Sequence, residues 1–382
     1  MSNAFEEARN IISLVEADDR RVGWTPPERK RPLQVAWLIA QSPWMGGEYY
    51  RAVRPAMLTN KHFGWDTCVA HEAGEDKGVS GVAVKAIGGQ VMRPDVLVVR
   101  PIGKPTAQSA WGMVRLMDCA REAGQLVVSD LDDDVWAHED WTPETRPADD
   151  QYEDWCWGAD AWLVSTEPIA ERVRERAAKP VPVRVAPNCW DPRTLGEGPR
   201  PVAGRRLGTR LWLSGRMSGD LELYSAIVTP ALEEWDCQFV HIGAEPDGLH
   251  LSLPPDRLLE LPTCTIPELG RLLSSTISVG VICAADNEFN RAKTLTHPVE
   301  LASAGLPLIV ASDLPIYSGV PGVVAPTPGA FETRLDDLLF PPAWKAQAEI
   351  AREWAIGQSI AAEEAYLAAL REIVDTLVTT LC

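Results

Sequence analysis

The sequence is poor in features that mark several common protein classes. No apolar run reaches the roughly 18 residues needed to cross a bilayer, so no transmembrane segment is predicted. None of the eight cysteines forms a Cys-x-x-Cys pair or a cysteine–histidine cluster with zinc spacing, which argues against a structural zinc site. We interpret the cysteines as reduced, mostly buried thiols and expect a cytoplasmic protein.

Positive charge and dinucleotide-binding motifs are also scarce. Lysine and arginine number 36 against 54 aspartates and glutamates, giving a net charge of −18. Non-specific polynucleotide binding is therefore not expected, although a local basic cleft is compatible with this composition. No Gly-x-Gly-x-x-Gly opens either half of the chain, which disfavours an oxidoreductase.

The sequence does contain a regular alternation of short apolar strands and helices. In the first half, strands are predicted at residues 35–39, 65–70, 96–99, 126–129, 161–164 and 183–186. Helices are expected from Glu48, over residues 107–123, and from Glu167 with Thr166 as N-cap. Such alternation predicts an α/β fold with a doubly wound parallel sheet.

The alternation restarts after residues 192–208, which are rich in proline, glycine and arginine. Further strands are predicted at residues 211–213, 237–242, 258–261, 277–282, 308–310 and 323–324. The expected organisation is a helix and lead-in over 1–30, a first Rossmann-like domain over 31–191, a linker over 192–208, a second such domain over 209–342 and a helix over 343–382 that packs back on the first domain.

One stretch of the second half carries a family resemblance. Phe289 and Asn290 are followed by Lys293 and Thr294, then by Glu300 on a predicted helix and a Gly-x-Pro turn before a strand. This order is similar to that of retaining glycosyltransferases of the GT-B fold, of the family-4-like type that includes many bacterial and phage enzymes.

Weaker matches to the same family occur in the first half, in the expected order. They are Gly46-Gly47 before Tyr50-Arg51, the acidic residues 130–134 after a strand, and Pro187-Asn188. Over roughly residues 33–340, the resemblance implies two Rossmann-like doubly wound domains facing a central cleft. It implies transfer of a sugar from a nucleoside diphosphate sugar to a hydroxyl acceptor, with retention of configuration.

The resemblance also assigns donor-binding residues in the second half. Charge develops on the leaving diphosphate, so preorganised cations there matter most. Lys293 is the first choice for that contact, Arg216 the second, and Glu300 is expected to bind the ribose hydroxyls. Asn290, Thr294 and His297 complete the set. The alternatives without a binding role are that Lys293 is a solvated surface lysine, that Glu300 is an acid on a helix surface, and that His297 only begins a helix.

One position departs from the family pattern. The family often pairs two glutamates separated by seven residues, but the residue eight positions before Glu300 is Ala292. The first glutamate of the pair, which would contact the donor sugar, is therefore absent from this sequence. This departure supports a second hypothesis, a catalytically degenerate protein that only binds a nucleotide sugar.

In the first half, a glycine pair and an acidic turn are the candidate site. Gly46 and Gly47 permit close approach of the backbone to a phosphate or sugar, and Arg51 follows one turn later. Asp130, Asp132 and Asp133 are the catalytic candidates. They could orient sugar hydroxyls, hold a divalent cation, or form only a solvated N-capping turn.

The sequence identifies the partners only by class. A nucleoside diphosphate sugar is the expected co-substrate, no tightly bound cofactor is expected, and a divalent metal is compatible but not expected, because cations and helix N-termini serve instead in this fold. The acceptor is a glycan, a protein side chain or a hydroxylated base of phage-type DNA. A sugar-nucleotide epimerase or phosphorylase on the same scaffold is the other enzymatic alternative.

Overall fold

The computed structural model describes residues 31–39, 42–44, 46–75, 81–100, 107–137, 158–177, 180–191, 206–210, 220–242 and 255–381. The predicted N-terminal helix, the strand predicted at 211–213, most of the predicted linker and Arg216 lie outside these residues. Within them, no helix combines the length and hydropathy that a membrane crossing needs.

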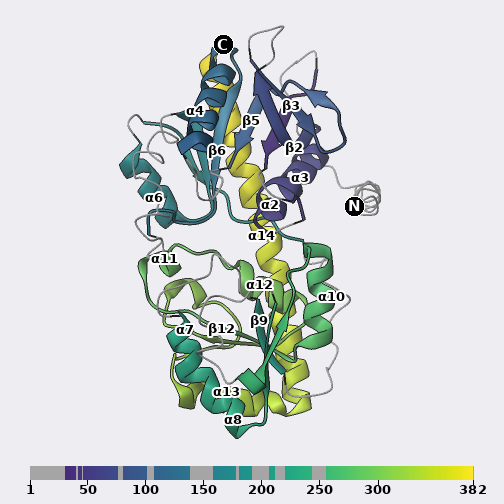
Figure 1. Cartoon of the computed structure of the whole chain (residues 1–382), viewed down its shortest axis with the longest axis vertical. Helices are drawn as coiled ribbons and strands as arrows, with labels where there is room; N and C mark the ends of the chain where they lie inside the picture. The colour runs from purple at the N-terminus through teal and green to yellow at the C-terminus, as the bar shows by residue number, and fades with distance from the viewer. Residues whose placement is uncertain are drawn as a thin grey trace.

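The first sheet forms the upper lobe in Figure 1 and is built on six parallel strands in the order β2-β1-β5-β6-β7-β8. The strands are β1 (Gln34–Leu38), β2 (Asp66–Glu75), β5 (Val96–Val99), β6 (Leu126–Leu131), β7 (Ala161–Val164) and β8 (Val183–Val185). Every residue of β5, β6 and β7 is buried, as expected for parallel strands that are covered on both faces.

Two features of this sheet differ from the prediction. The antiparallel strands β3 (Val82–Ala86) and β4 (Val91–Met92) extend it beside β2 and were not predicted, because they are short and joined by a glycine turn. Strand β6 runs on through Asp130 and Leu131, which pair with β7. The prediction that Asp130 begins the turn after this strand is therefore wrong.

The second sheet forms the lower lobe and has six parallel strands. They are β9 (Arg206–Arg210), β10 (Gln238–Ile242), β11 (Leu258–Leu261), β12 (Val279–Cys283), β13 (Leu308–Ala311) and β14 (Val323–Val324). Their order, β11-β10-β9-β12-β13-β14, is the 3-2-1-4-5-6 order of the Rossmann fold. Strand β9 begins at Arg206, inside the segment predicted as a linker.

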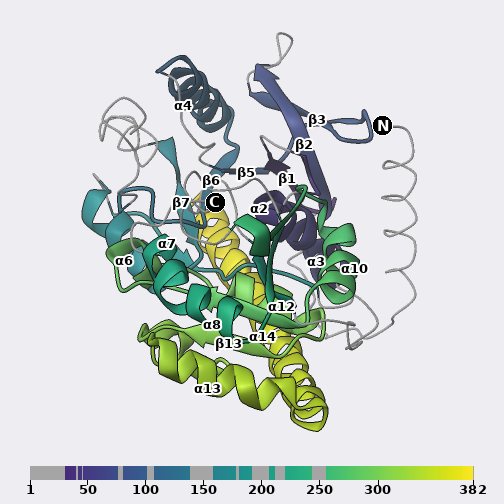
Figure 2. The same cartoon turned by 60° about the horizontal axis from the view of Figure 1, so that its bottom comes forward.

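Helices cover both faces of each sheet (Figures 1 and 2). In the upper lobe they are α2 (Gly46–Glu48), the π-helical turn η1 (Tyr49–Val53), α3 (Arg54–Phe63), α4 (Ala107–Glu122) and α6 (Glu167–Arg176). In the lower lobe they are α7 (Asp220–Leu223), η3 (Tyr224–Val228), α8 (Thr229–Glu234), η4 (Pro255–Arg257), α10 (Ile266–Thr276), α11 (Glu288–Arg291), α12 (Thr296–Ser303), η5 (Pro315–Tyr317) and α13 (Pro328–Leu339). Left-handed glycines end several of them, as Gly64 does for α3.

The long helix α14 (Pro341–Leu381) joins the two lobes. Its first part, including Trp344 and Ala348, packs into the core of the second sheet. Its later part, including Tyr366 and Leu370, packs into the core that also holds Val35 and Trp37 of the first sheet. Both views show the yellow helix running from the lower lobe to the upper one.

Candidate functional site

The site lies where loops that follow the strands of the two sheets meet. Ligands of open α/β sheets bind outside the carboxyl ends of the strands, near the point where the strand order reverses. Thr166 after β7 and Asn188 after β8 donate hydrogen bonds to Ala292 and Thr296 of the second lobe. The segment after β6 reaches the same region, where Asp133 interacts electrostatically with Lys293. The structure therefore brings the acidic turn of the first half close to the Lys293 segment of the second.

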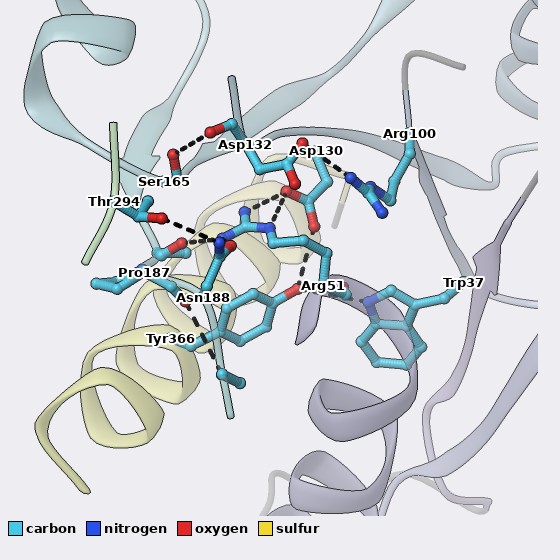
Figure 3. Close-up of polar contacts among 12 residues, drawn as sticks. Trp37, Arg51, Arg100, Asp130, Asp132, Ser165, Pro187, Asn188, Thr294 and Tyr366 are labelled. Atoms are coloured by element: carbon cyan, nitrogen blue, oxygen red, sulfur yellow. Dashed lines mark hydrogen bonds and ion pairs between the residues drawn. The ribbon is translucent and has the colours of Figure 1, made fainter. Parts of the chain in front are cut away.

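Arg51 and Asp130 form an ion pair that is fully enclosed by protein. Both side chains are completely buried, and the Arg51 Nε donates to Asp130 Oδ1 at 2.8 Å (Figure 3). A second guanidinium nitrogen also bonds this carboxylate, and a third reaches the Ala186 carbonyl oxygen. Burial raises the pKa of Asp130 above its usual range, against the opposing effect of Arg51.

Aromatic residues close the remaining sides of this pair. The Arg51 guanidinium carbon lies 5.3 Å from the ring centre of Tyr366 on α14, whose hydroxyl donates to Asp130 Oδ2 at 3.5 Å. Trp37 Nε1 donates to the same hydroxyl at 3.4 Å. The structure therefore places the predicted donor ligand Arg51 and the predicted catalytic Asp130 against each other, in the interior of the first lobe.

A second arginine, Arg100, organises the glycine pair and the next aspartate. It follows β5 and donates to Glu48 Oε2 and to Asp132 Oδ1, each at 2.8 Å. A methyl group added at Gly47 would lie 3.4 Å from the Arg100 guanidinium nitrogens and 3.6 Å from Asp132. Gly47 thus lies against this ion-pair network, at distances where a methyl group would make ordinary van der Waals contact. Sequence reasoning missed the network, although Arg100 directly follows a predicted strand.

Asp133 and Lys293 belong to opposite lobes and interact electrostatically. Burial and the neighbouring Asp132 raise the pKa of Asp133 to about 6, while Lys293 opposes the shift. Burial lowers the pKa of Lys293 against the attraction of Asp133 and Asp220. Lys293 Nζ lies 5.1 Å from the ring centre of Phe289, and no salt bridge to it is found in the described part of the chain.

Asp220 at the start of α7 is a site residue that the sequence did not single out. Its Oδ1 accepts hydrogen bonds from the Ala285 backbone at 2.7 Å and from Asn290 Nδ2 at 2.9 Å. Burial raises the pKa of Asp220 to about 6. Asn290 also donates to the Ala285 carbonyl oxygen at 3.0 Å, so its amide holds the loop that precedes Lys293.

The remaining predicted donor residues lie on or just before α12. Glu300 is buried and its Oε1 accepts a hydrogen bond from Tyr50 of the first lobe at 2.5 Å. Thr294 accepts a hydrogen bond from Asn188 at 3.3 Å, and His297 lies half-buried in the first turn of the helix. Glu300 and Thr294 are thus in contact with the opposite lobe.

The neighbours of the acidic turn (Asp132, Asp133 and Asp134) are cations and backbone amides. Among the described residues, no group of three or more histidine, cysteine, aspartate or glutamate side chains has an arrangement that could hold a metal ion. Asp132 is paired with Arg100, and Asp134 accepts hydrogen bonds from the backbone of Trp136 and Ala137. In the structure these carboxylates face cations and amides.

No protein-family model and no curated protein matches the sequence. Solved structures do resemble it. Sucrose-phosphate synthase from Thermosynechococcus elongatus superposes with a TM-score of 0.61 at 12% identity, over 91% of this chain and 100% of its own. HepE of Anabaena, solved with UDP and glucose, gives 0.53 at 13% identity over 91% and 100%.

The chain has the GT-B fold. A third similar structure, a Listeria monocytogenes protein assigned as a UDP-N-acetylglucosamine 2-epimerase, gives a TM-score of 0.52 at 12% identity over 91% of this chain and 98% of its own. The likeness extends over both lobes in all three. It confirms the predicted α/β architecture with two Rossmann-like sheets.

Proposed function

We propose that the protein is a glycosyltransferase that takes a sugar from a nucleoside diphosphate sugar. The observation that carries the proposal is the position of Lys293. Its ammonium group is partly desolvated between two lobes of a GT-B fold, and no salt bridge to it is found among the described residues. A cation in this position is suited to meet a phosphate.

The chemistry of the transfer explains why such a cation is useful. As the glycosidic bond breaks, negative charge grows on the leaving diphosphate, and a fixed cation in a site with little water stabilises that charge strongly. The Lys293 segment is fixed by Asn290 and Thr294, which are both hydrogen-bonded. A phosphate between Lys293 and the start of α12 would also meet the positive end of that helix.

Finer features of the reaction belong to the same proposal. We infer transfer to a hydroxyl acceptor with retention of configuration, and the support for retention is the sequence resemblance alone. We assign Asp133 as the carboxylate that faces the reacting sugar, because it interacts with Lys293 and its pKa of about 6 suits proton exchange near neutral pH. The cations supply the charge stabilisation, so no metal is invoked.

One observation favours the alternative of a binding protein without catalysis. Ala292, which stands where the family often has a glutamate, packs in the core of the first lobe. A sugar contact from this position is therefore missing. Turnover distinguishes this alternative, because a binding protein would retain nucleotide affinity and leave the donor intact.

Isothermal titration calorimetry with UDP, GDP, ADP, CMP and dTDP and their common sugars tests the proposal. We expect one nucleotide to bind, and Lys293→Met to weaken its binding by about tenfold or more, as expected when a charge-assisted hydrogen bond is lost. Lys345→Met is the matched control, because that side chain is 73% exposed on α14. Consumption of the donor and the anomeric configuration of the product, followed by NMR, then test transfer and retention.

Binding of no nucleotide by the wild-type protein would reject the proposal. Binding without consumption of any donor, across glycan, peptide and nucleic-acid acceptors, would favour the non-catalytic alternative. Equal weakening in the Lys293 and Lys345 variants would show that the phosphate is held elsewhere.

A further inference from the structure

The segment that carries Lys293 is held on both sides by side chains of the opposite lobe. Thr166 Oγ1 donates to the carbonyl oxygen of Ala292 at 2.8 Å. Asn188 Nδ2 donates to Thr294 Oγ1 at 3.3 Å and to Thr296 Oγ1 at 3.0 Å. Lys293 therefore lies between two residues that the first lobe holds in place.

Asn188 has the chemistry that such a link requires. Its Oδ1 accepts a hydrogen bond from Arg51 Nη1 at 3.4 Å, while its Nδ2 donates to the hydroxyls of Thr294 and Thr296. Figure 3 shows Asn188 between Arg51 and Thr294. A carboxamide provides an acceptor and two donors within one side chain. Because Arg51 is fixed by its buried pair with Asp130, Asn188 is oriented by a rigid part of the first lobe.

Thr166 offers an independent sign of the same link. It stands at the N-cap of α6, where a threonine hydroxyl commonly accepts a hydrogen bond from the helix backbone. No such capping bond is present, and the hydroxyl is used to reach Ala292 across the lobes. The helix thus forgoes a local interaction while the cross-lobe contact is made.

We propose that Asn188 and Thr166 are positioning residues that orient Lys293 from the opposite lobe. The direction of the cation toward the diphosphate is then set only when the two lobes are in contact, so affinity for the nucleotide depends on residues that never touch it. This inference rests on the proposed function, because it concerns the same cation.

The test measures nucleotide affinity and melting temperature in the full-length protein. Asn188→Leu removes the amide at similar size, Thr166→Val removes the hydroxyl, and Thr296→Val breaks the Asn188 link from its other end. Asn60→Leu is the control, because Asn60 Nδ2 donates a hydrogen bond to the Trp65 carbonyl oxygen at 2.9 Å, entirely within the first lobe. The probe is the nucleoside diphosphate that binds the wild-type protein most tightly.

We expect Asn188→Leu to weaken binding by about tenfold and Thr166→Val by about threefold, while Asn60→Leu changes melting temperature without changing affinity. The double variant Asn188→Leu/Thr296→Val should bind no more weakly than Asn188→Leu, because both changes break one link. If the Asn188 variant does not fold, the two threonine variants decide.

Wild-type affinity in the Asn188 and Thr166 variants would overturn the inference and leave the proposed function intact. Fully additive losses for Asn188 and Thr296 would overturn it as well. A wild-type protein that binds no nucleoside diphosphate would instead reject the proposed function, and with it this inference.

Discussion

Two cations near the meeting point of the lobes are treated in opposite ways by the fold. Arg51 is completely buried and fully paired, with Asp130 and the Ala186 carbonyl oxygen as partners. Lys293 is half-buried, interacts electrostatically with Asp133 and Asp220, and forms no salt bridge with a described carboxylate. The sequence predicts both as donor-binding residues.

The difference separates a charge used for architecture from a charge available to a ligand. A buried charge that loses its partner has a high free energy, so the Arg51–Asp130 ion pair is expected to stay intact in the folded protein. A desolvated cation without an ion pair lowers the stability of the folded protein and becomes favourable when an anion arrives. Burial alone therefore does not identify a ligand site, whereas burial without pairing does point to one.

The largest effect on stability is expected from breaking the buried Arg51–Asp130 ion pair. Asp130→Leu leaves the Arg51 guanidinium buried without its partner and should lower the free energy of unfolding by about 3–5 kcal/mol. The double variant Arg51→Met/Asp130→Leu should recover most of this loss, since no uncompensated charge remains. Urea denaturation measures both. A double variant as unstable as the single one would contradict a structural role for the pair.

In the region around Lys293, the contribution of Asp220 to the free energy of unfolding should depend on pH. The pKa of Asp220 is raised to about 6 in the folded protein, so the folded state holds this proton more tightly than the unfolded state. Its stabilising contribution is complete below about pH 4 and is lost as the pH rises through about 6. Asp220→Asn keeps an oxygen that can accept these hydrogen bonds but removes the ionisable carboxyl group.

The free energy of unfolding of Asp220→Asn, relative to the wild type, should therefore increase between pH 4 and pH 7, by on the order of 2 kcal/mol. Urea denaturation at several pH values gives this difference directly. A difference that stays constant with pH would show that Asp220 is an ordinary ionised carboxylate.

A smaller effect is expected at Lys293 itself. Burial lowers the pKa of this lysine, which means that its charged form reduces the stability of the folded protein at pH 7. Lys293→Met should leave the free energy of unfolding unchanged or raise it by up to about 1 kcal/mol, while nucleotide affinity falls. Destabilisation by several kcal/mol, as for the Arg51 pair, would remove the contrast between the two cations.

The smallest effect on stability is expected from the exposed ion pair between Arg172 of α6 and Glu288 of the opposite lobe. The Glu288 side chain is 60% exposed, so solvent weakens the attraction. Glu288→Gln should cost less than about 1 kcal/mol, and the loss should shrink further in high salt. A larger or salt-independent loss, measured by thermal unfolding in low and high salt, would indicate that this pair helps hold the lobes together.

The fold followed from local patterns in the sequence. Apolar runs such as residues 96–99 and 161–164 coincide with β5 and β7, because strands buried on both faces must be apolar throughout. The β3–β4 hairpin escaped detection, since its strands are short and only one face of β3 is deeply buried. The end of β6 was misplaced because Asp130 is a poor strand residue that tertiary pairing with Arg51 makes acceptable.

The candidate site was less accessible to sequence reasoning. The motif around Lys293 located the segment, but the partners that hold it, Thr166 and Asn188, are more than 100 positions away. Asp220 carried no signal, since an acid at a helix start is usually a solvated residue. Spatial pairing distinguished Arg51 from Lys293, and no spacing in the sequence encodes that pairing.

The long helix α14 also bears on how the protein is made. The Trp37–Tyr366 contact spans 329 positions, and Tyr366, Leu370 and Ile373 complete the core on one face of the first sheet. Because α14 follows the second lobe in the sequence, this face of the first sheet can be covered only after the second lobe has been synthesised. Domains usually mature one after another from the N-terminus. Here the core of the first half is completed by residues of α14, so we expect the two halves to reach their native state together.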